Sequence, residues 1–237
     1  MITIKEYTTK APLQMIGEFS GICWGANIED RQKNIKRAWD CIESGHGRTE
    51  EFPDVYCVID GYSAKCLREL YTHIGGSPTR LQASTRYIDY EKKGVEVVTP
   101  PSIEKNQDAL NVWNSTVETI RSAMRILKEY GIPNEDLTNL LPLAYRSKMV
   151  WKVNLRTLVN FFGMRLCNRA YWEIRALAKE LKDALSEYSP EWKEIADALF
   201  VPKCVHVGFC TEAKSCHYRP PKSEINIVWE GGNHDPQ

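Results

Sequence analysis

The order in which strand-like and helix-like patterns follow one another constrains the fold of this chain most. Helical spacing of apolar residues and short runs of β-branched and aromatic residues do not alternate one for one. The predicted helices cover 31–44, 63–76, 108–130, 154–188 and 191–200, and the predicted strands cover 55–59, 95–98 and 149–153. Strict alternation would favour a doubly wound sheet. This order instead predicts an α+β fold with a mixed sheet core flanked by long helices.

Length and charge narrow the class of protein. The chain has 237 residues, enough for one large domain, and its 31 Lys and Arg residues balance its 31 Asp and Glu residues. A neutral chain argues against a protein that coats nucleic acid. No apolar run approaches the roughly 18 residues of a membrane span, and residues 1–7 lack the layout of a signal peptide. We therefore expect a cytoplasmic protein with no nucleic-acid or membrane partner, whose cysteines are reduced thiols.

A segment at 79–87 that is rich in hydrogen-bond donors gives the first indication of function. It reads Thr-Arg-Leu-Gln-Ala-Ser-Thr-Arg-Tyr and follows a turn that contains Gly75, Gly76 and Pro78. Guanidinium groups stay charged near neutral pH, and Ser, Gln and backbone N–H groups complete a ring of donors. The two commonest phosphate loops, GxGxxG and GxxxxGK[ST], are absent from the sequence. The segment therefore predicts a differently built loop that binds a phosphate and a planar heterocycle.

A second polar cluster lies on the predicted helix that starts at Asn154. At about 100° per residue, Asn154 and Arg165 share one face, and Arg156 and Asn160 share another. Arginine and asparagine near a helix start, together with the helix dipole, suit an anion. The alternative is that these arginines pair with acids on a solvated face.

Three of the eight cysteines recur every six residues near the C-terminus, at Cys204, Cys210 and Cys216, with His206 and His217 nearby. Thiolates and imidazoles bind zinc, but the usual CxxC knuckle is absent. We predict free thiols and no metal. A zinc site made by Cys204, Cys210, Cys216 and His217 stays open as an alternative, and so does a redox role.

The two polar clusters together resemble those of the flavin-dependent thymidylate synthases, which methylate dUMP with reduced FAD. The family's Arg-His-Arg motif, followed by a spaced Ser and then Arg-Tyr, is matched by His73 and by Ser84 to Tyr87 if two residues are inserted between them. A looser match to the family's His-x-x-Pro-x-Glu-His segment spans Gly45 to Phe52. The family's later pattern is matched by Leu141, Pro142, Asn154, Arg156, Leu158, Asn160, Phe161, Arg165 and Trp172 to Ile174.

The resemblance implies an FAD-dependent methyltransferase that makes dTMP, with methylenetetrahydrofolate and NADPH as co-substrates. It implies a homotetramer with active sites at subunit interfaces. The catalytic domain would be residues 1–200, followed by a Cys-containing extension at 201–237. Arg165 would face the uracil as the catalytic residue. The other residues implied to bind dUMP are Glu69, Arg80, Gln82, Ser84, Thr85 and Arg86. Those implied to bind FAD are His46, Arg48, Glu51, His73, Asn154, Arg156 and Asn160.

The sequence departs from the family pattern where positive charge is expected. Thr72 and Ile74 flank His73 in place of two arginines, and Thr138 stands where a further arginine is expected. Gln82 occupies a position that is usually acidic. The candidate replacement cations are Arg80, Arg146 and Lys148.

These departures leave three alternatives open. One is a sister enzyme that hydroxymethylates a pyrimidine deoxynucleotide. Another is an inactive flavin- or nucleotide-binding homologue, and the third is a zinc-stabilised interaction module.

Overall fold

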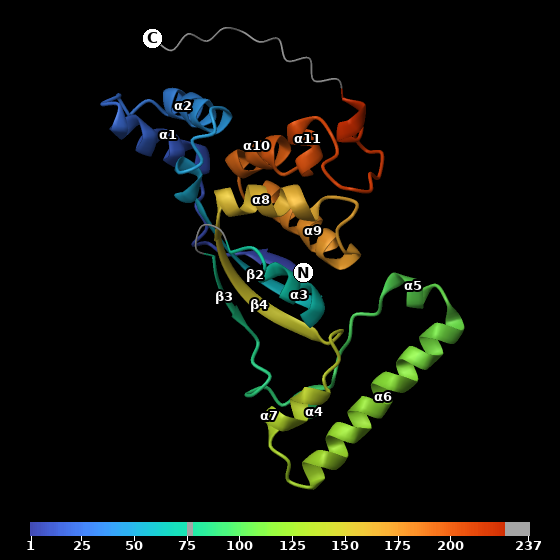
Figure 1. Cartoon of the computed structure of the whole chain (residues 1–237). Coiled ribbons are helices and arrows are strands. Elements are labelled where there is room, and N and C mark those ends of the chain that lie inside the picture. The colour runs from blue at the N-terminus through green and yellow to red at the C-terminus, as the bar shows by residue number, and fades with distance from the viewer. Residues whose placement is uncertain (75–77, 226–237) are drawn as a thin grey trace.

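A four-stranded antiparallel sheet forms the centre of the molecule (Figure 1). The computed structural model describes residues 1–74 and 78–225. The strands β1 (Ile2–Ile4), β2 (Asp54–Ser63), β3 (Thr79–Gln82) and β4 (Arg146–Asn154) lie in the order β1-β2-β4-β3. The α+β class is confirmed, but each pair of these strands is antiparallel, where a mixed sheet was expected. No helix among the described residues is both long enough and apolar enough to cross a membrane.

Alternating burial along the two central strands explains why they pair in this register. In β2, Val55, Cys57 and Ile59 are fully buried while their neighbours are only half-buried. In β4, Val153, Trp151 and Met149 lie directly opposite them. Because side chains alternate between the faces of a strand, this register places one continuous apolar face toward the helices. Both strands extend the predicted runs at 55–59 and 149–153.

The helices on that face are α3 (Ala64–Leu70), α8 (Leu155–Arg165), α9 (Trp172–Tyr188) and α10 (Pro190–Leu199). Ser63 caps α3 as predicted, accepting from the Cys66 N–H at 3.0 Å. The helix ends at Leu70, and the stop predicted at Gly75 and Gly76 lies outside the described residues. A buried carboxylate, Glu173 of α9, accepts from the backbone N–H and the hydroxyl of Ser63 at 2.6 and 2.5 Å. Glu173 thereby holds the start of α3 against α9.

The single helix predicted over 154–188 is wrong, because a turn at 166–171 separates α8 from α9. Within the turn, the Ala170 N–H donates to the Cys167 carbonyl at 2.9 Å. The Arg175 guanidinium donates to the Asn168 carbonyl at 2.8 Å. Both helices bury an apolar face in the same core, so the apolar pattern continues across the break.

A smaller core lies at the far end of β4, around α4 (Tyr90–Lys93), α6 (Gln107–Glu129) and α7 (Asn134–Leu137). The short helices α5 (Pro101–Glu104) and η2 (Thr138–Leu140) complete this part, which stands apart from the main helical layer in Figure 1. The predicted strand at 95–98 is wrong, since only Val97 makes a bridge, to Tyr145. Two backbone hydrogen bonds flank this bridge, from Arg146 N–H to the Glu96 carbonyl and from Val98 N–H to the Ala144 carbonyl, both at 2.8 Å. The Val95 carbonyl instead accepts from the Arg121 guanidinium at 2.6 Å, so the pairing does not extend to Val95.

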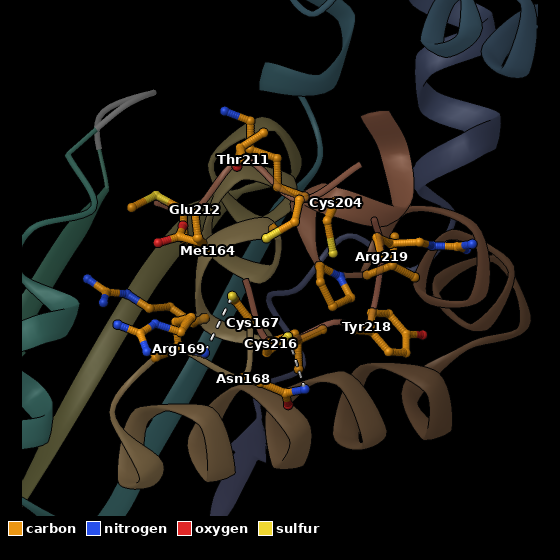
Figure 2. Close-up of a pocket in the computed structure, with 18 of the residues that line it drawn as sticks. Met164, Cys167, Asn168, Arg169, Cys204, Thr211, Glu212, Cys216, Tyr218 and Arg219 are labelled. Atoms are coloured by element: carbon orange, nitrogen blue, oxygen red, sulfur yellow. Dashed lines mark hydrogen bonds between the residues drawn. The ribbon is translucent and has the colours of Figure 1, made fainter. Parts of the chain in front are cut away.

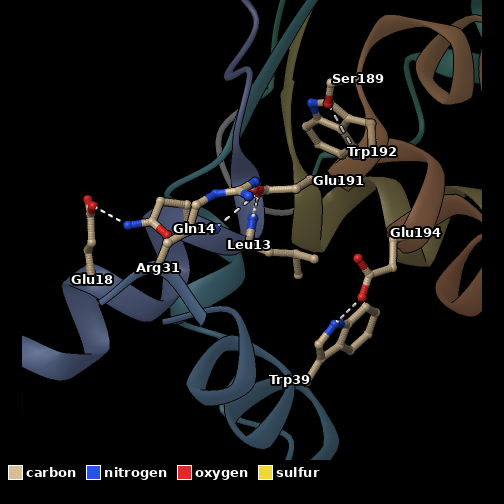
Figure 3. A network of polar contacts seen from close by, with 9 residues as sticks. All are labelled: Leu13, Gln14, Glu18, Arg31, Trp39, Ser189, Glu191, Trp192 and Glu194. Atoms are coloured by element: carbon tan, nitrogen blue, oxygen red, sulfur yellow. Dashed lines mark hydrogen bonds and ion pairs between the residues drawn. The ribbon is translucent and has the colours of Figure 1, made fainter. Parts of the chain in front are cut away.

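At the other end, α1 (Pro12–Cys23) and α2 (Arg31–Glu43) pack closely, followed by η1 (Thr49–Glu51). A Cβ on Gly17 would lie 1.9 Å from the Asn34 carbonyl oxygen, so glycine permits this approach. The start of α1 has no side-chain cap of its own. Instead the buried Glu191 of α10 accepts from the Leu13 and Gln14 N–H groups at 2.8 and 3.1 Å (Figure 3). Neither β1 nor α1 was predicted from the sequence.

The described part of the C-terminal extension has little core. It contains α11 (Lys203–Val207) and the short turn η3 (Lys222–Glu224). Cys210 is the only buried residue in 201–225. Its N–H donates to the Pro220 carbonyl at 2.7 Å, which folds the segment back on itself. The end of the predicted extension, 226–237, lies outside the described residues.

Candidate active site

Arg165, the last residue of α8, is held by three partners, one in the last turn of α3 and two in the segment that follows it. Its Nε donates to His73 Nε2 at 2.9 Å, and its Nη1 donates to Glu69 Oε2 at 3.0 Å. Its Nη2 donates to Thr72 Oγ1, also at 3.0 Å. The side chain is 15% exposed, so the guanidinium is mostly withdrawn from solvent. Three partners at three nitrogens fix the plane of the guanidinium.

His73 is neutral in this arrangement. It is buried and packs edge-on against Phe161, with ring centroids 5.0 Å apart. Burial, followed by the positive charges of Arg165 and Arg80, lowers the pKa of His73 to about 4. Because Nε2 accepts from Arg165, the ring proton is assigned to Nδ1. The site therefore presents one fixed positive charge beside an uncharged imidazole.

Arg80 of β3 supplies a second guanidinium beside His73. It donates to the carbonyls of His73 and Tyr71 at 3.4 and 3.2 Å, and it lies 4.3 Å from the centre of the Tyr71 ring. Of the three candidate replacement cations, Arg80 is the one that contacts this segment. Arg146 pairs with Glu96 at 3.8 Å and Lys148 with Asp60 at 2.5 Å.

The rest of the predicted dUMP segment leads away from Arg165. Gln82 donates to the Ser147 hydroxyl at 3.2 Å, and Ser84 Oγ accepts from the Arg86 N–H at 3.1 Å. Thr85 is half-buried. The Arg86 guanidinium donates to Glu135 of α7 at 2.9 Å. Within one chain, Arg86 thus pairs with α7, and Ser84 Oγ bonds to Arg86 rather than to the partners of Arg165. Residues 79–82, expected as part of a loop, form β3.

A cavity of about 370 Å³ lies beside α8 and is lined by part of the predicted FAD set. Arg156 lies on its wall and donates to Glu51 at 2.5 Å. A Cβ on Gly47 would lie 3.1 Å from Arg156 Nε, so this backbone approaches the guanidinium closely because the residue is glycine. Burial raises the pKa of Glu50, and Arg156 opposes that rise. The lining residues are Gly45, Gly47, Glu50, Arg156, Val159, Asn160, Gly163, Met164, Lys203 and His206.

The other residues predicted to bind FAD do not line this cavity. His46 and Arg48 are exposed next to this cavity, at the start of η1. Asn154 is buried and caps α8, accepting from the Thr157 N–H at 2.9 Å. His73 lies in the Arg165 cluster instead. The sequence analysis had assigned neither Glu50 nor Lys203 to this cavity. Lys203 belongs to the extension, where the family pattern has no motif that could have indicated it.

Another cavity, of about 510 Å³, lies between the α8–α9 turn and the extension. Cys204, Cys210 and Cys216 line it together with Cys167, as Figure 2 shows for the labelled cysteines. His217, the fourth residue of the candidate zinc set, does not line this cavity. Among the described residues, no three His, Cys, Asp or Glu side chains are already arranged to hold a metal ion.

Comparison with known proteins supports the resemblance seen in the sequence. The Thy1 family, described as thymidylate synthase complementing protein, matches residues 4–191. The flavin-dependent thymidylate synthase of Pyrococcus abyssi is 37% identical over 189 residues, which cover 78% of this chain and 75% of that protein. The enzyme of the same name from Pyrococcus furiosus is 31% identical over 223 residues, covering 89% of each.

A solved structure agrees with the sequence relatives. The flavin-dependent thymidylate synthase ThyX of Helicobacter pylori, complexed with FAD and dUMP, matches with a TM-score of 0.63 and 25% identity. The match covers 81% of this chain and 98% of that one. The fold and the polar clusters thus define an α+β nucleotide enzyme. The chain belongs to the flavin-dependent thymidylate synthase family.

Proposed function

We propose that this protein converts dUMP to dTMP by reductive methylation, with methylenetetrahydrofolate as carbon donor, FAD as cofactor and NADPH as reductant. The observation that carries the proposal is the fixed guanidinium of Arg165, the residue that the family resemblance assigns to the uracil. A pre-oriented cation stabilises negative charge on a pyrimidine at no further cost in reorganisation. Neutral His73 fixes this cation without adding a second charge to it.

The donors around the 370 Å³ cavity fit the phosphate groups of a dinucleotide. Arg156 and Lys203 offer positive charge, and Asn160 offers an amide. Gly47 allows the Arg156 guanidinium to lie against the backbone of the cavity wall. Glu51 engages one nitrogen of Arg156, and the guanidinium has four further N–H donors. When bound, FAD would supply the reducing equivalents, while Arg156, Asn160 and Lys203 would hold and orient it.

We further propose that each active site combines residues of two subunits of a homotetramer. Support comes from the separation of Arg86, which pairs with Glu135, from the Glu69–His73–Arg165 cluster. If one dUMP contacts both groups, we expect a second chain to provide one of them. Residues 1–200 would form the catalytic domain and 201–237 an extension, since the family match ends at residue 191. A cytoplasmic location stays a prediction.

The test is the visible spectrum of the purified protein, followed by turnover with dUMP, methylenetetrahydrofolate and NADPH and by the mass of the product. We expect a yellow protein and a product with the mass of dTMP. A colourless preparation that takes up no FAD would contradict the proposal. A product one oxygen atom heavier than dTMP would identify the hydroxymethylating alternative. Bound FAD without turnover would identify the inactive homologue.

A further inference from the structure

Four cysteines from two distant parts of the sequence gather around the 510 Å³ cavity. Cys167 comes from the turn between α8 and α9, and Cys204, Cys210 and Cys216 come from the extension. Figure 2 shows the side chains of Cys167, Cys204 and Cys216 directed toward the same space. The other four cysteines belong to different elements, α1, α2, β2 and α3. The fold thus sorts the eight cysteines into four scattered residues and one cluster.

The segment that carries three of these cysteines is short of apolar contacts. Between 201 and 225 only Cys210 is buried, and most of 211–224 is exposed. Gly208 and His217 both have positive φ, at 80° and 61°. His217 is the only non-glycine residue in that region of φ among the described residues. A loop-rich segment without a core is held in one conformation by cross-links or by a metal.

Polar hydrogens already point at two of the four sulfur atoms. The side-chain amide of Asn168 donates to Cys216 Sγ at 3.7 Å, and the Arg169 N–H donates to Cys167 Sγ at 3.5 Å. N–H donors of this kind stabilise thiolates and orient them as ligands. Around the same cavity lie the cations Arg169, Lys179, Lys182, Lys203 and Arg219. Four thiolates on one divalent ion leave a net negative centre, which these cations would offset.

We propose that Cys167, Cys204, Cys210 and Cys216 form a tetrathiolate zinc site that joins the C-terminal extension to the α8–α9 turn. Cys167 takes the place of His217, which does not line the cavity. Thiolate sets of this composition bind zinc or iron–sulfur clusters. We assign zinc because the site's role is structural and the family's redox chemistry belongs to the flavin.

The side chains close onto the ion when it binds. In the described part of the chain these cysteines are within one cavity but not at the mutual positions of a finished site. All four are free thiols, so none is committed to a disulfide. Metal binding of this kind is coupled to local folding, which suits a segment with so few apolar contacts.

Zinc binding would also restrict the movement of Arg165, the proposed catalytic residue. Cys167 lies two residues after Arg165, and Arg165 itself borders the cavity. Fixing Cys167 therefore fixes the end of α8 from which the guanidinium projects toward His73 and Glu69. The zinc site does not depend on the proposed reaction, because its ligands lie outside the dUMP and FAD sets.

The experiment measures zinc, iron and acid-labile sulfide in the full-length protein purified under reducing conditions, with Cys204→Ser and Cys216→Ser as variants. Cys23→Ser is the matched control, since Cys23 is exposed on α1 and outside the cavity. We expect about one zinc per chain in the wild type and in the control, and its loss in both variants. FAD content is measured in parallel, so failure of the proposed function is recognised separately.

A second measurement keeps the test decisive if the variants do not fold. In the wild-type protein, a mercurial that modifies thiols should release the zinc, and cobalt exchanged into the site should show sulfur-to-metal charge-transfer absorption. Protein without zinc, or zinc retained in both variants, would overturn the proposal. Iron with labile sulfide would overturn the assignment to zinc. A disulfide among the four cysteines in metal-free protein would overturn the site itself.

Discussion

At the scale of single residues, the role that we propose for Arg165 is to oppose negative charge on a pyrimidine with its fixed guanidinium. We expect Arg165→Ala to lower kcat by about 100- to 1,000-fold, the usual effect of losing one pre-oriented group in a transition state. FAD should remain bound, since the cavity at Arg156 is separate. Single-turnover flavin oxidation and the visible spectrum check both points. Unchanged turnover would remove the role given to Arg165.

His73 gives the protein a stability that depends on pH. Its pKa falls from 6.5 to about 4 on folding, so the unfolded state binds the proton more readily between these values. The contribution of His73 to the free energy of unfolding is therefore complete above about pH 6.5 and is lost as the pH falls toward 4. The loss reaches about 3 kcal/mol, because each unit of difference in pKa corresponds to about 1.4 kcal/mol. Urea unfolding at several pH values should show this slope in the wild type and a weaker one in His73→Gln. The exposed His46, changed to Gln, serves as control.

At the scale of elements, one buried carboxylate bonds to both N-terminal helices and links them to α10. Glu191 accepts from two N–H groups at the start of α1 and from Arg31 of α2 at 2.6 Å. Glu191→Ala leaves those buried donors unpaired, so we expect a loss of about 3 kcal/mol in the free energy of unfolding. Glu194→Ala, which removes only the bond from Trp39, should cost under about 1 kcal/mol. Equal losses in chemical denaturation would contradict this account.

Sequence patterns identified elements that depend on local spacing and missed those that depend on distant partners. The helix at α6 was predicted from its apolar stripe, and the cap at Ser63 from its side chain. The short strands β1 and β3 could not be predicted, because each is held by pairing with a longer strand far away in sequence. The break between α8 and α9 was hidden because both helices face the same core.

At the scale of the whole molecule, the separation of Arg86 from Arg165 predicts shared active sites. If dUMP is held by residues of two chains, mixed tetramers of Arg165→Ala and Arg86→Ala contain sites in which both residues are intact. We expect unfolding and refolding the two inactive variants together to restore up to about a quarter of the wild-type activity, as statistical mixing at a two-chain site predicts. Each variant refolded alone is the control. A mixture as inactive as its components would place each site within one chain.

The sequence by itself determined the α+β class and the chemical character of the two polar clusters, and the resemblance of their motifs indicated the family. These properties depend on residue type and local periodicity, which the chain carries before it folds. Only the tertiary structure decided which donors meet. It brought His73, Glu69 and Thr72 onto Arg165 and directed Arg86 to Glu135. It also placed Cys167 rather than His217 beside the three C-terminal cysteines. Such contacts join residues up to about a hundred positions apart, and no local pattern records the path of the chain between them.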